Sequence, residues 1–186
     1  MTQNDIKNGV CKPMTILFAR GTTEGGNVGT LAGPPFFQAV GAAMGAANVA
    51  VQGIDYPADI PGFLAGGDAG GSKLMAATVG QVMKACPSTN LVMSGYSQGG
   101  QLVHNAASML TPAETAFVKS AVIFGDPDNG KAVGTVSAAD TLVVCHNGDL
   151  ICAVPALVLA PHLTYAKDAG TAAAFVVANA GAAKAK

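Results

Sequence analysis

The stretch Val92-Met93-Ser94-Gly95-Tyr96-Ser97-Gln98-Gly99-Gly100 decides the fold expected of this chain. An apolar run from Leu91 to Met93 leads into the pattern G-x-S-x-G, and a helix-like segment follows. That order predicts a nucleophile elbow, in which a strand, a tight turn carrying Ser97 and a helix succeed one another. The two glycines of the pattern suit such a turn because the chain crowds itself there and leaves little room for side chains.

The elbow predicts two functional positions. Ser97 Oγ is expected at the carboxyl edge of a sheet, and the backbone N–H of Gln98, at a helix N-terminus, is expected to point toward a developing oxyanion. A glycine-rich chain produces G-x-S-x-G by chance in roughly one case in ten, so the remaining sequence has to agree with it.

Composition limits the class of protein. We expect one domain over residues 1–186, long enough for a single substantial core. Half of the residues are hydrophobic, only 11% are charged and the net charge is −1. Without a basic cluster, nucleic acid and anionic membranes are poor candidate partners. The low charge suits work against an apolar or insoluble surface, and equally suits an Ala- and Gly-rich sequence with no such role.

Apolar runs alternate with helical segments along the chain. The predicted strands are Met14–Ala19, Val49–Ile54, Leu91–Ser94, Ala121–Phe124 and Thr141–Val144. The predicted helices are Phe36–Ala47, Ser72–Lys84 with Ser72 as its cap, Gln98–Leu110, a short one opened by the capping box Thr111–Glu114, and Leu163–Ala178. Residues 55–71 are expected to form a long irregular loop, and residues 182–186 a frayed tail.

Continuous apolar strands separated by helices are typical of a parallel sheet that is buried on both faces. The sequence therefore predicts an α/β fold, a three-layer α/β/α sandwich with about five parallel strands. Functional groups should gather in the loops beyond the carboxyl ends of those strands.

Four cysteines, at Cys11, Cys86, Cys145 and Cys152, have no zinc-site spacing and favour two disulfides in a secreted protein. Cys145 and Cys152 are near enough to close a small loop, which would leave Cys11 for Cys86. The other two pairings stay open, as do four free thiols in a cytosolic protein. The polar N-terminus shows no secretory signal, so a secreted protein would be present in mature form with an added start residue. No apolar run approaches the roughly 18 residues of a membrane span.

A serine nucleophile needs a base and a group that orients the base. His104 stands two helical turns beyond Ser97, roughly 10 Å away, and is interpreted as a helix-surface residue. His162 and Asp149 fit the chain order Ser, Asp, His of α/β-hydrolases. His146 is a further candidate near the same edge. Considered one at a time, Asp149 is equally consistent with an ordinary turn residue, and His162 with a residue that begins a helix.

The oxyanion site needs a second donor from a loop after an earlier strand, and Thr22 is placed for this role. Arg20 and Glu24 flank Thr22 and either brace the loop as an ion pair or are solvated loop charges. No phosphate-binding, dinucleotide or metal motif is present, so we expect no metal and no cofactor.

Together these motifs resemble the fungal cutinases, secreted serine esterases that are grouped with the acetylxylan esterases. The matching segments are Arg20-Gly21-Thr22-Thr23-Glu24-x-Gly26-Asn27, Gly95-Tyr96-Ser97-Gln98-Gly99, Gly125-Asp126-Pro127, Cys145-x-x-Gly148-Asp149-x-Ile151-Cys152 and Pro161-His162-Leu163-x-Tyr165. They span almost the whole chain in order.

The resemblance implies a lidless, minimal α/β-hydrolase that cleaves ester bonds in cutin and in soluble acyl esters. It implies the triad Ser97, Asp149 and His162, with Thr22 and Gln98 as oxyanion donors. It also matches the disulfide pairings Cys11–Cys86 and Cys145–Cys152. The groove residues that it implies are Tyr96 and two apolar segments, Phe63–Leu64 and Ala153–Pro161, the latter with Leu157 and Val158. Without the resemblance, these two segments could equally cap the edge of the core.

We therefore expect a secreted, extracellular monomer whose partner is an insoluble polyester or lipid-like ester, with no nucleic acid bound and no transmembrane segment. The nearest alternative is an acetylxylan esterase that releases acetate from xylan. A catalytically silent surface-active or carbohydrate-binding protein on the same fold is the alternative from another class.

Overall fold

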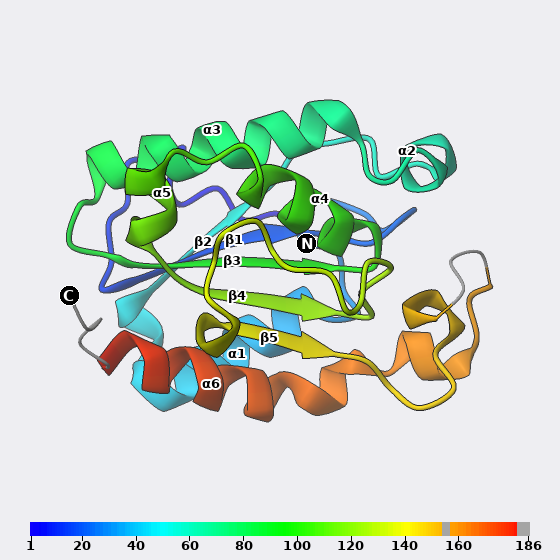
Figure 1. The fold of residues 1–186 in the computed structure, drawn as a ribbon. Helices are drawn as coiled ribbons and strands as arrows, with labels where there is room; N and C mark the ends of the chain where they lie inside the picture. Colours follow the sequence, from blue (N-terminus) through cyan, green and yellow to red (C-terminus); the bar gives the residue numbers. More distant parts are fainter. Residues whose placement is uncertain (154–156, 182–186) are drawn as a thin grey trace.

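A computed structural model describes residues 1–153 and 157–181. The tail expected over residues 182–186 and residues 154–156 of one expected groove wall lie outside this described part. Within it, five parallel strands form one sheet in the order β2-β1-β3-β4-β5 (Figure 1). Their bounds are β1 Met14–Ala19, β2 Val49–Gly53, β3 Asn90–Tyr96, β4 Val118–Phe124 and β5 Thr141–Val144.

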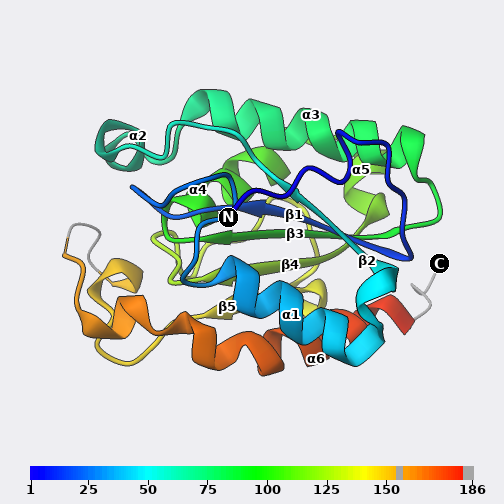
Figure 2. The same cartoon turned by 180° about the vertical axis from the view of Figure 1, so that it is seen from behind.

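Helices cover both faces of the sheet, as Figures 1 and 2 show from opposite sides. One face carries α1 (Gly33–Met44) and α6 (Ala169–Gly181), and the other carries α3 (Ala69–Ala85), α4 (Gln98–Ala107) and α5 (Pro112–Phe117). The expected three-layer α/β/α sandwich is confirmed. Successive side chains of a strand point to opposite faces of the sheet, so each strand contributes side chains to the cores on both faces. On β1, Ile16 and Phe18 join the core under α1 and α6, whereas Leu17 and Ala19 join the core under α3 and α4.

The strand order indicates where on the sheet the functional site lies. Chain connections run outward in opposite directions from the neighbouring strands β1 and β3, and ligands of open α/β sheets bind beyond the carboxyl ends at such a switch point. The loop after β1 and the elbow after β3 therefore meet there. The short helix α2 (Ile60–Leu64) and the turns η3 (Leu150–Cys152) and η4 (Ala160–Leu163) flank the same edge (Figure 1).

Several expected boundaries are wrong, and the capping residues explain why. Helix α3 begins at Ala69, because the Asp68 carboxylate accepts a hydrogen bond from the Gly71 N–H at 2.6 Å and so caps it before Ser72. The expected loop over residues 55–71 contains α2, which Asp59 caps. Helix α1 ends at Met44 because Gly45 has a φ of 90°, and the 3-10 turn η1 (Ala46–Asn48) follows.

The last helix also starts later than expected. Residues 160–168 form two 3-10 turns, η4 and η5 (Tyr165–Asp168), separated by Thr164, so α6 begins only at Ala169. One further 3-10 turn, η2 (Ala138–Asp140), precedes β5.

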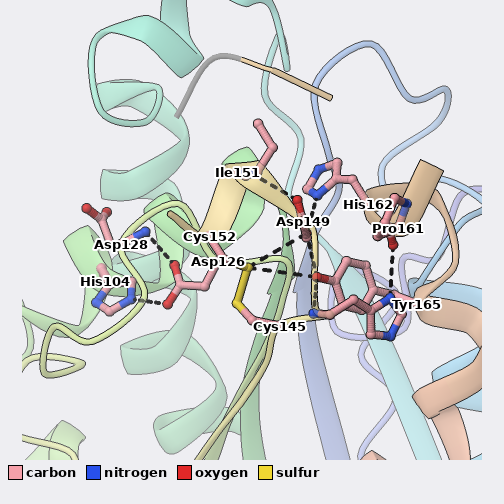
Figure 3. The surroundings of a disulfide bond; sticks show 11 residues. His104, Asp126, Asp128, Cys145, Asp149, Ile151, Cys152, Pro161, His162 and Tyr165 are labelled. Carbon is pink, nitrogen blue, oxygen red and sulfur yellow. Dashed lines mark hydrogen bonds and ion pairs between the residues drawn. A yellow bond between two sulfur atoms is a disulfide. The ribbon is translucent and has the colours of Figure 1, made fainter. Parts of the chain in front are cut away.

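His104 is not a surface residue, which corrects the interpretation from its helical position. Its side chain is buried because the chain after β4 covers this side of α4. Its Nε2 lies 2.9 Å from Asp126 Oδ2 and its Nδ1 lies 3.1 Å from the Ala132 carbonyl oxygen (Figure 3). Both partners are acceptors, so the site favours the imidazolium form, in which both ring nitrogens carry protons. Burial lowers the pKa of His104, but the bonds to Asp126 and Ala132 outweigh it and leave the pKa above its ordinary value.

We predict that His104→Leu lowers the free energy of unfolding by about 3 kcal/mol at about pH 6, because Asp126 is left buried without its cation. A raised histidine pKa contributes stability that is complete below the unfolded pKa of about 6.5 and is lost as the pH rises through the folded pKa. The difference from wild type should therefore shrink by about pH 9, measured by urea denaturation. The exposed Gln81→Leu exchange on α3 is the control. An equal loss at both pH values would contradict the charged pair.

Candidate active site

Ser97 sits in a strained turn between β3 and α4. Its φ is 56° and its ψ is −121°, a left-handed conformation that is rare for a residue with a side chain. A Cβ on Gly95 would lie 2.2 Å from the Gly99 carbonyl oxygen, and a Cβ on Gly99 would lie 1.9 Å from the Ala19 carbonyl oxygen. Both glycines of the motif are therefore required by close approach of the backbone, and the elbow holds Ser97 at the end of β3.

Gln98 joins three segments at this edge. It is the first residue of α4, so its backbone N–H has no partner inside the helix. Its side-chain Nε2 donates to Thr22 Oγ1 at 2.8 Å and to the Asp59 carbonyl oxygen at 2.9 Å. The elbow, the loop after β1 and the start of α2 are thus tied to one buried amide.

The loop after β1 is braced by hydrogen bonds of Arg20 and Glu24, and neither of the two alternatives, an ion pair or solvated loop charges, describes it fully. Arg20 Nε donates to the Glu24 carbonyl oxygen at 2.6 Å. The Glu24 carboxylate accepts the backbone N–H groups of Gly21, Thr30 and Leu31. No Arg20–Glu24 salt bridge is present among the described residues. Because Thr22 lies inside this braced loop, its hydroxyl has a fixed position.

Asp149 lies in a loop closed by the disulfide Cys145–Cys152, and the other disulfide joins Cys11 to Cys86, so both expected pairings are confirmed. Asp149 Oδ1 accepts the Ile151 N–H at 3.0 Å. Its Oδ2 accepts His162 Nδ1 at 2.8 Å and the Tyr165 hydroxyl at 2.5 Å (Figure 3). Burial raises the pKa of Asp149, but the hydrogen bonds from Tyr165 and His162 outweigh burial and leave the pKa below its usual value.

The His162 imidazole is fixed on its other sides by packing. It stacks on the Tyr96 ring at 5.0 Å between centroids, and the Tyr96 hydroxyl donates to the His162 carbonyl oxygen at 2.8 Å. A Cβ on Gly125 would lie 2.8 Å from His162 Cε1, so only a glycine leaves room for the ring. With Nδ1 directed to Asp149, Nε2 is the nitrogen left for chemistry.

Ser97 and His162 line one pocket of about 630 Å³ at the carboxyl edge. No hydrogen bond joins the two side chains in the described part of the chain, a contact that often tightens only when substrate is bound. Thr22 and Tyr96 line the same pocket. Its apolar walls are Leu31, Ile60, Phe63, Leu64, Ile151, Val158 and Leu163.

The sequence did not predict all of the residues that line the pocket, and one residue that it predicted as a wall does not line it. Leu31, Ile60, Ile151 and Leu163 were not predicted as wall residues, although Ile151 and Leu163 stand in the motifs that carry Asp149 and His162. Leu157, an expected wall residue, is 53% exposed and does not line the pocket.

His146, the further histidine candidate, does not line the pocket. Its Nε2 lies 2.6 Å from Asp168 Oδ2 and its Nδ1 lies 2.9 Å from the Pro161 carbonyl oxygen. Its position beside Cys145 made it a candidate, but these contacts tie it to the segment that carries His162 instead. Burial lowers the pKa of His146, and the contacts with Pro161 and Asp168 outweigh it and raise the pKa.

The described residues show neither a metal-binding cluster nor a membrane-spanning helix. No group of three or more His, Cys, Asp or Glu side chains is arranged there to hold a metal ion. None of the helices in that part of the chain is both long and apolar enough to cross a membrane.

Comparison with known proteins gives the family. The family model described as Cutinase matches residues 10–180. A cutinase of Botryotinia fuckeliana is 55% identical over 176 residues, which cover 95% of this chain and 87% of that protein. The structure of Trichoderma reesei cutinase with a phosphonate inhibitor has a TM-score of 0.91 and 48% identity, covering 97% of this chain and 80% of that one. An acetylxylan esterase has a TM-score of 0.77 at 22% identity, covering 92% and 100%, which shows a shared fold alone.

The fold is that of the α/β-hydrolases, as the structural neighbours show. Within that class the chain belongs to the cutinase family, and it is a carboxylic ester hydrolase.

The two disulfides should differ in what their removal does. Chain entropy predicts a loss of about 2.5 kcal/mol of stability for the bridge that spans 7 residues and about 4.5 kcal/mol for the bridge that spans 75. Replacing Cys145 and Cys152 by Ala should lower the rate of ester hydrolysis, because the loop that holds Asp149 loosens. Replacing Cys11 and Cys86 should lower the melting temperature further yet keep the rate at low temperature. A lower rate of ester hydrolysis without the Cys11–Cys86 bridge than without the Cys145–Cys152 bridge would contradict these separate roles.

Proposed function

We propose that this protein is a secreted serine esterase that hydrolyses the ester bonds of cutin and related polyesters, and of short- to medium-chain acyl esters, through an acyl-enzyme on Ser97. One observation carries the proposal. Ser97, on a strained elbow, shares a pocket with a histidine whose Nδ1 is bonded to a buried carboxylate. That combination is the geometry by which a weak serine nucleophile is activated.

In the first half-reaction Ser97 Oγ attacks the ester carbonyl carbon while His162 Nε2 accepts the hydroxyl proton. Asp149 keeps the imidazole in the tautomer with Nδ1 protonated and stabilises the imidazolium that forms. His162 then gives the proton to the departing alcohol, and the acyl group remains on Ser97. Water attacks the acyl-enzyme with His162 again as the base, which releases the acid and restores Ser97.

The tetrahedral intermediate carries a negative oxygen that needs hydrogen-bond donors already in place. The backbone N–H of Gln98, at the start of α4, is one proposed donor. The Thr22 hydroxyl is the second. Asp59 offers only a carbonyl oxygen, so the Gln98 amide must turn its Nε2 toward it, and the same Nε2 donates to Thr22 Oγ1. Thr22 therefore accepts from Gln98, and its own proton is free to point into the pocket.

The pocket walls support an apolar acyl chain as the group that is bound beside Ser97. Ile60 and Leu64 on α2 are 58% and 70% exposed, and Val158 and Leu163 on the facing segment are 55% and 50% exposed. Apolar side chains this exposed at the rim are suited to binding an insoluble polymer, because contact with the polymer removes their apolar surface from water. Two disulfides, which pair all four cysteines of the sequence, support an extracellular location. The single sheet supports one catalytic domain.

Ser97→Ala tests the proposal. We expect at least a thousandfold loss of p-nitrophenyl butyrate hydrolysis, with the melting temperature unchanged or raised because alanine removes no packing. The exposed Ser88→Ala exchange, at the opposite edge of the sheet, is the matched control and should keep the wild-type rate. Near wild-type turnover by Ser97→Ala would overturn the proposed mechanism. Wild-type protein should release acid from a cutin film, and release from acetylated xylan alone would assign the substrate of an acetylxylan esterase instead.

Thr22→Val tests the second oxyanion donor. The variant keeps the β-branched shape and removes the hydroxyl, so we expect kcat to fall by about 100-fold with little change in KM. Thr22→Ser, which keeps the hydroxyl, should stay within about threefold of wild type by the same reasoning. Equal losses in the two variants would show that packing of the loop, rather than hydrogen bonding to the oxyanion, limits the rate.

A further inference from the structure

Asp149 receives a second strong hydrogen bond besides that from His162. The Tyr165 hydroxyl donates to Asp149 Oδ2 at 2.5 Å, and this is the same oxygen that accepts His162 Nδ1 (Figure 3). Tyr165 is 1% exposed and comes from η5, three residues after His162. The carboxylate of the proposed triad is thus hydrogen-bonded to a buried phenol.

The direction of this hydrogen bond is set by the backbone. The His146 N–H donates to the Tyr165 hydroxyl oxygen at 3.1 Å, so that oxygen acts as the acceptor there. Its single proton is then directed to the carboxylate, which has none to offer when it is ionised. The ring is held as well, since it stacks on the His146 imidazole at 4.1 Å between centroids. The phenol therefore meets Asp149 as a fixed donor.

We infer that Tyr165 is a positioning residue of the esterase reaction: its hydroxyl fixes the Asp149 carboxylate and withdraws part of its negative charge from His162. The inference rests on the proposed function of Ser97, Asp149 and His162. A carboxylate that shares its charge with two donors attracts the imidazole proton less than a carboxylate with one donor. The carboxylate thus holds the Nδ1 proton in place while Nε2 of His162 acts as the base.

Other groups near Asp149 have their own partners. Oδ1 accepts the Ile151 N–H, and the Cys152 sulfur is in a disulfide. His146 is bonded to Asp168 and Pro161, contacts that do not involve the Tyr165 hydroxyl. The Tyr96 hydroxyl donates to the His162 carbonyl oxygen. Removing only the Tyr165 hydroxyl therefore alters one contact of Asp149 and takes the acceptor from the His146 backbone N–H, while the side chains of the neighbouring titratable groups keep their partners.

Tyr165→Phe removes that hydroxyl and keeps the stacked ring. We expect kcat to fall about tenfold with KM little changed, and the acid limb of the kcat/KM profile to move to higher pH by about half a unit to one unit. Tyr56→Phe is the matched control, because Tyr56 is also buried and its hydroxyl donates to the Arg20 carbonyl oxygen, away from Asp149. The control should leave the acid limb in place, whatever its effect on stability.

An acid limb that stays in place or moves to lower pH in Tyr165→Phe would overturn the inference. If the hydroxyl had only a structural role, its removal would lower the rate without moving the acid limb to higher pH. If this variant does not fold, a ring-fluorinated tyrosine at residue 165 replaces it. That phenol is a stronger donor of the same shape, so the limb should move to lower pH, and an unchanged limb would again overturn the inference. Labelling of wild type by a fluorophosphonate separates the two proposals: a wild type that is not labelled at Ser97 refutes the proposed function itself.

Discussion

The close contact between the elbow and the end of β1 is the constraint on which the site depends. Gly99 meets the Ala19 carbonyl so closely that no side chain fits between them, and Gly95 meets Gly99 in the same way. The absence of side chains at these two positions lets β3, α4 and β1 meet at the switch point of the sheet. This crowding also accounts for the left-handed conformation of Ser97, which costs on the order of 1–3 kcal/mol and persists only because the surroundings impose it.

The other proposed groups are positioned by hydrogen bonds that converge on this edge. Gln98 ties the loop of Thr22 and the start of α2 to the elbow through one side-chain amide. On the opposite side, a disulfide-closed loop, two 3-10 turns and a pair of tyrosines hold Asp149 and His162. Rigid loops of this kind suit a reaction in which donors and bases must be in place before charge develops. The apolar rim then provides contact with the substrate without contributing to the chemistry.

Much of this arrangement was predictable from local signals. The strands Met14–Ala19 and Thr141–Val144 have the bounds that their apolar runs predicted, and the order Ser97, Asp149, His162 placed all three at one edge. The missed features depend on distant contacts. His104 is buried only because the chain after β4 folds over α4, and Tyr165 reaches Asp149 only because η4 and η5 interrupt the expected helix. Periodicity carries no information about such contacts.

The most direct test of the proposed mechanism is the crystal structure of this protein after reaction with an alkyl phosphonate, whose tetrahedral phosphorus resembles the intermediate of ester hydrolysis. The proposed mechanism predicts a covalent bond to Ser97 Oγ, with the phosphonyl oxygen within hydrogen-bond distance of the Gln98 N–H and the Thr22 hydroxyl. It also predicts that the alkyl chain lies between α2 and the segment that carries Val158. A phosphonate bound to another residue, or an oxygen turned away from both donors, would contradict it.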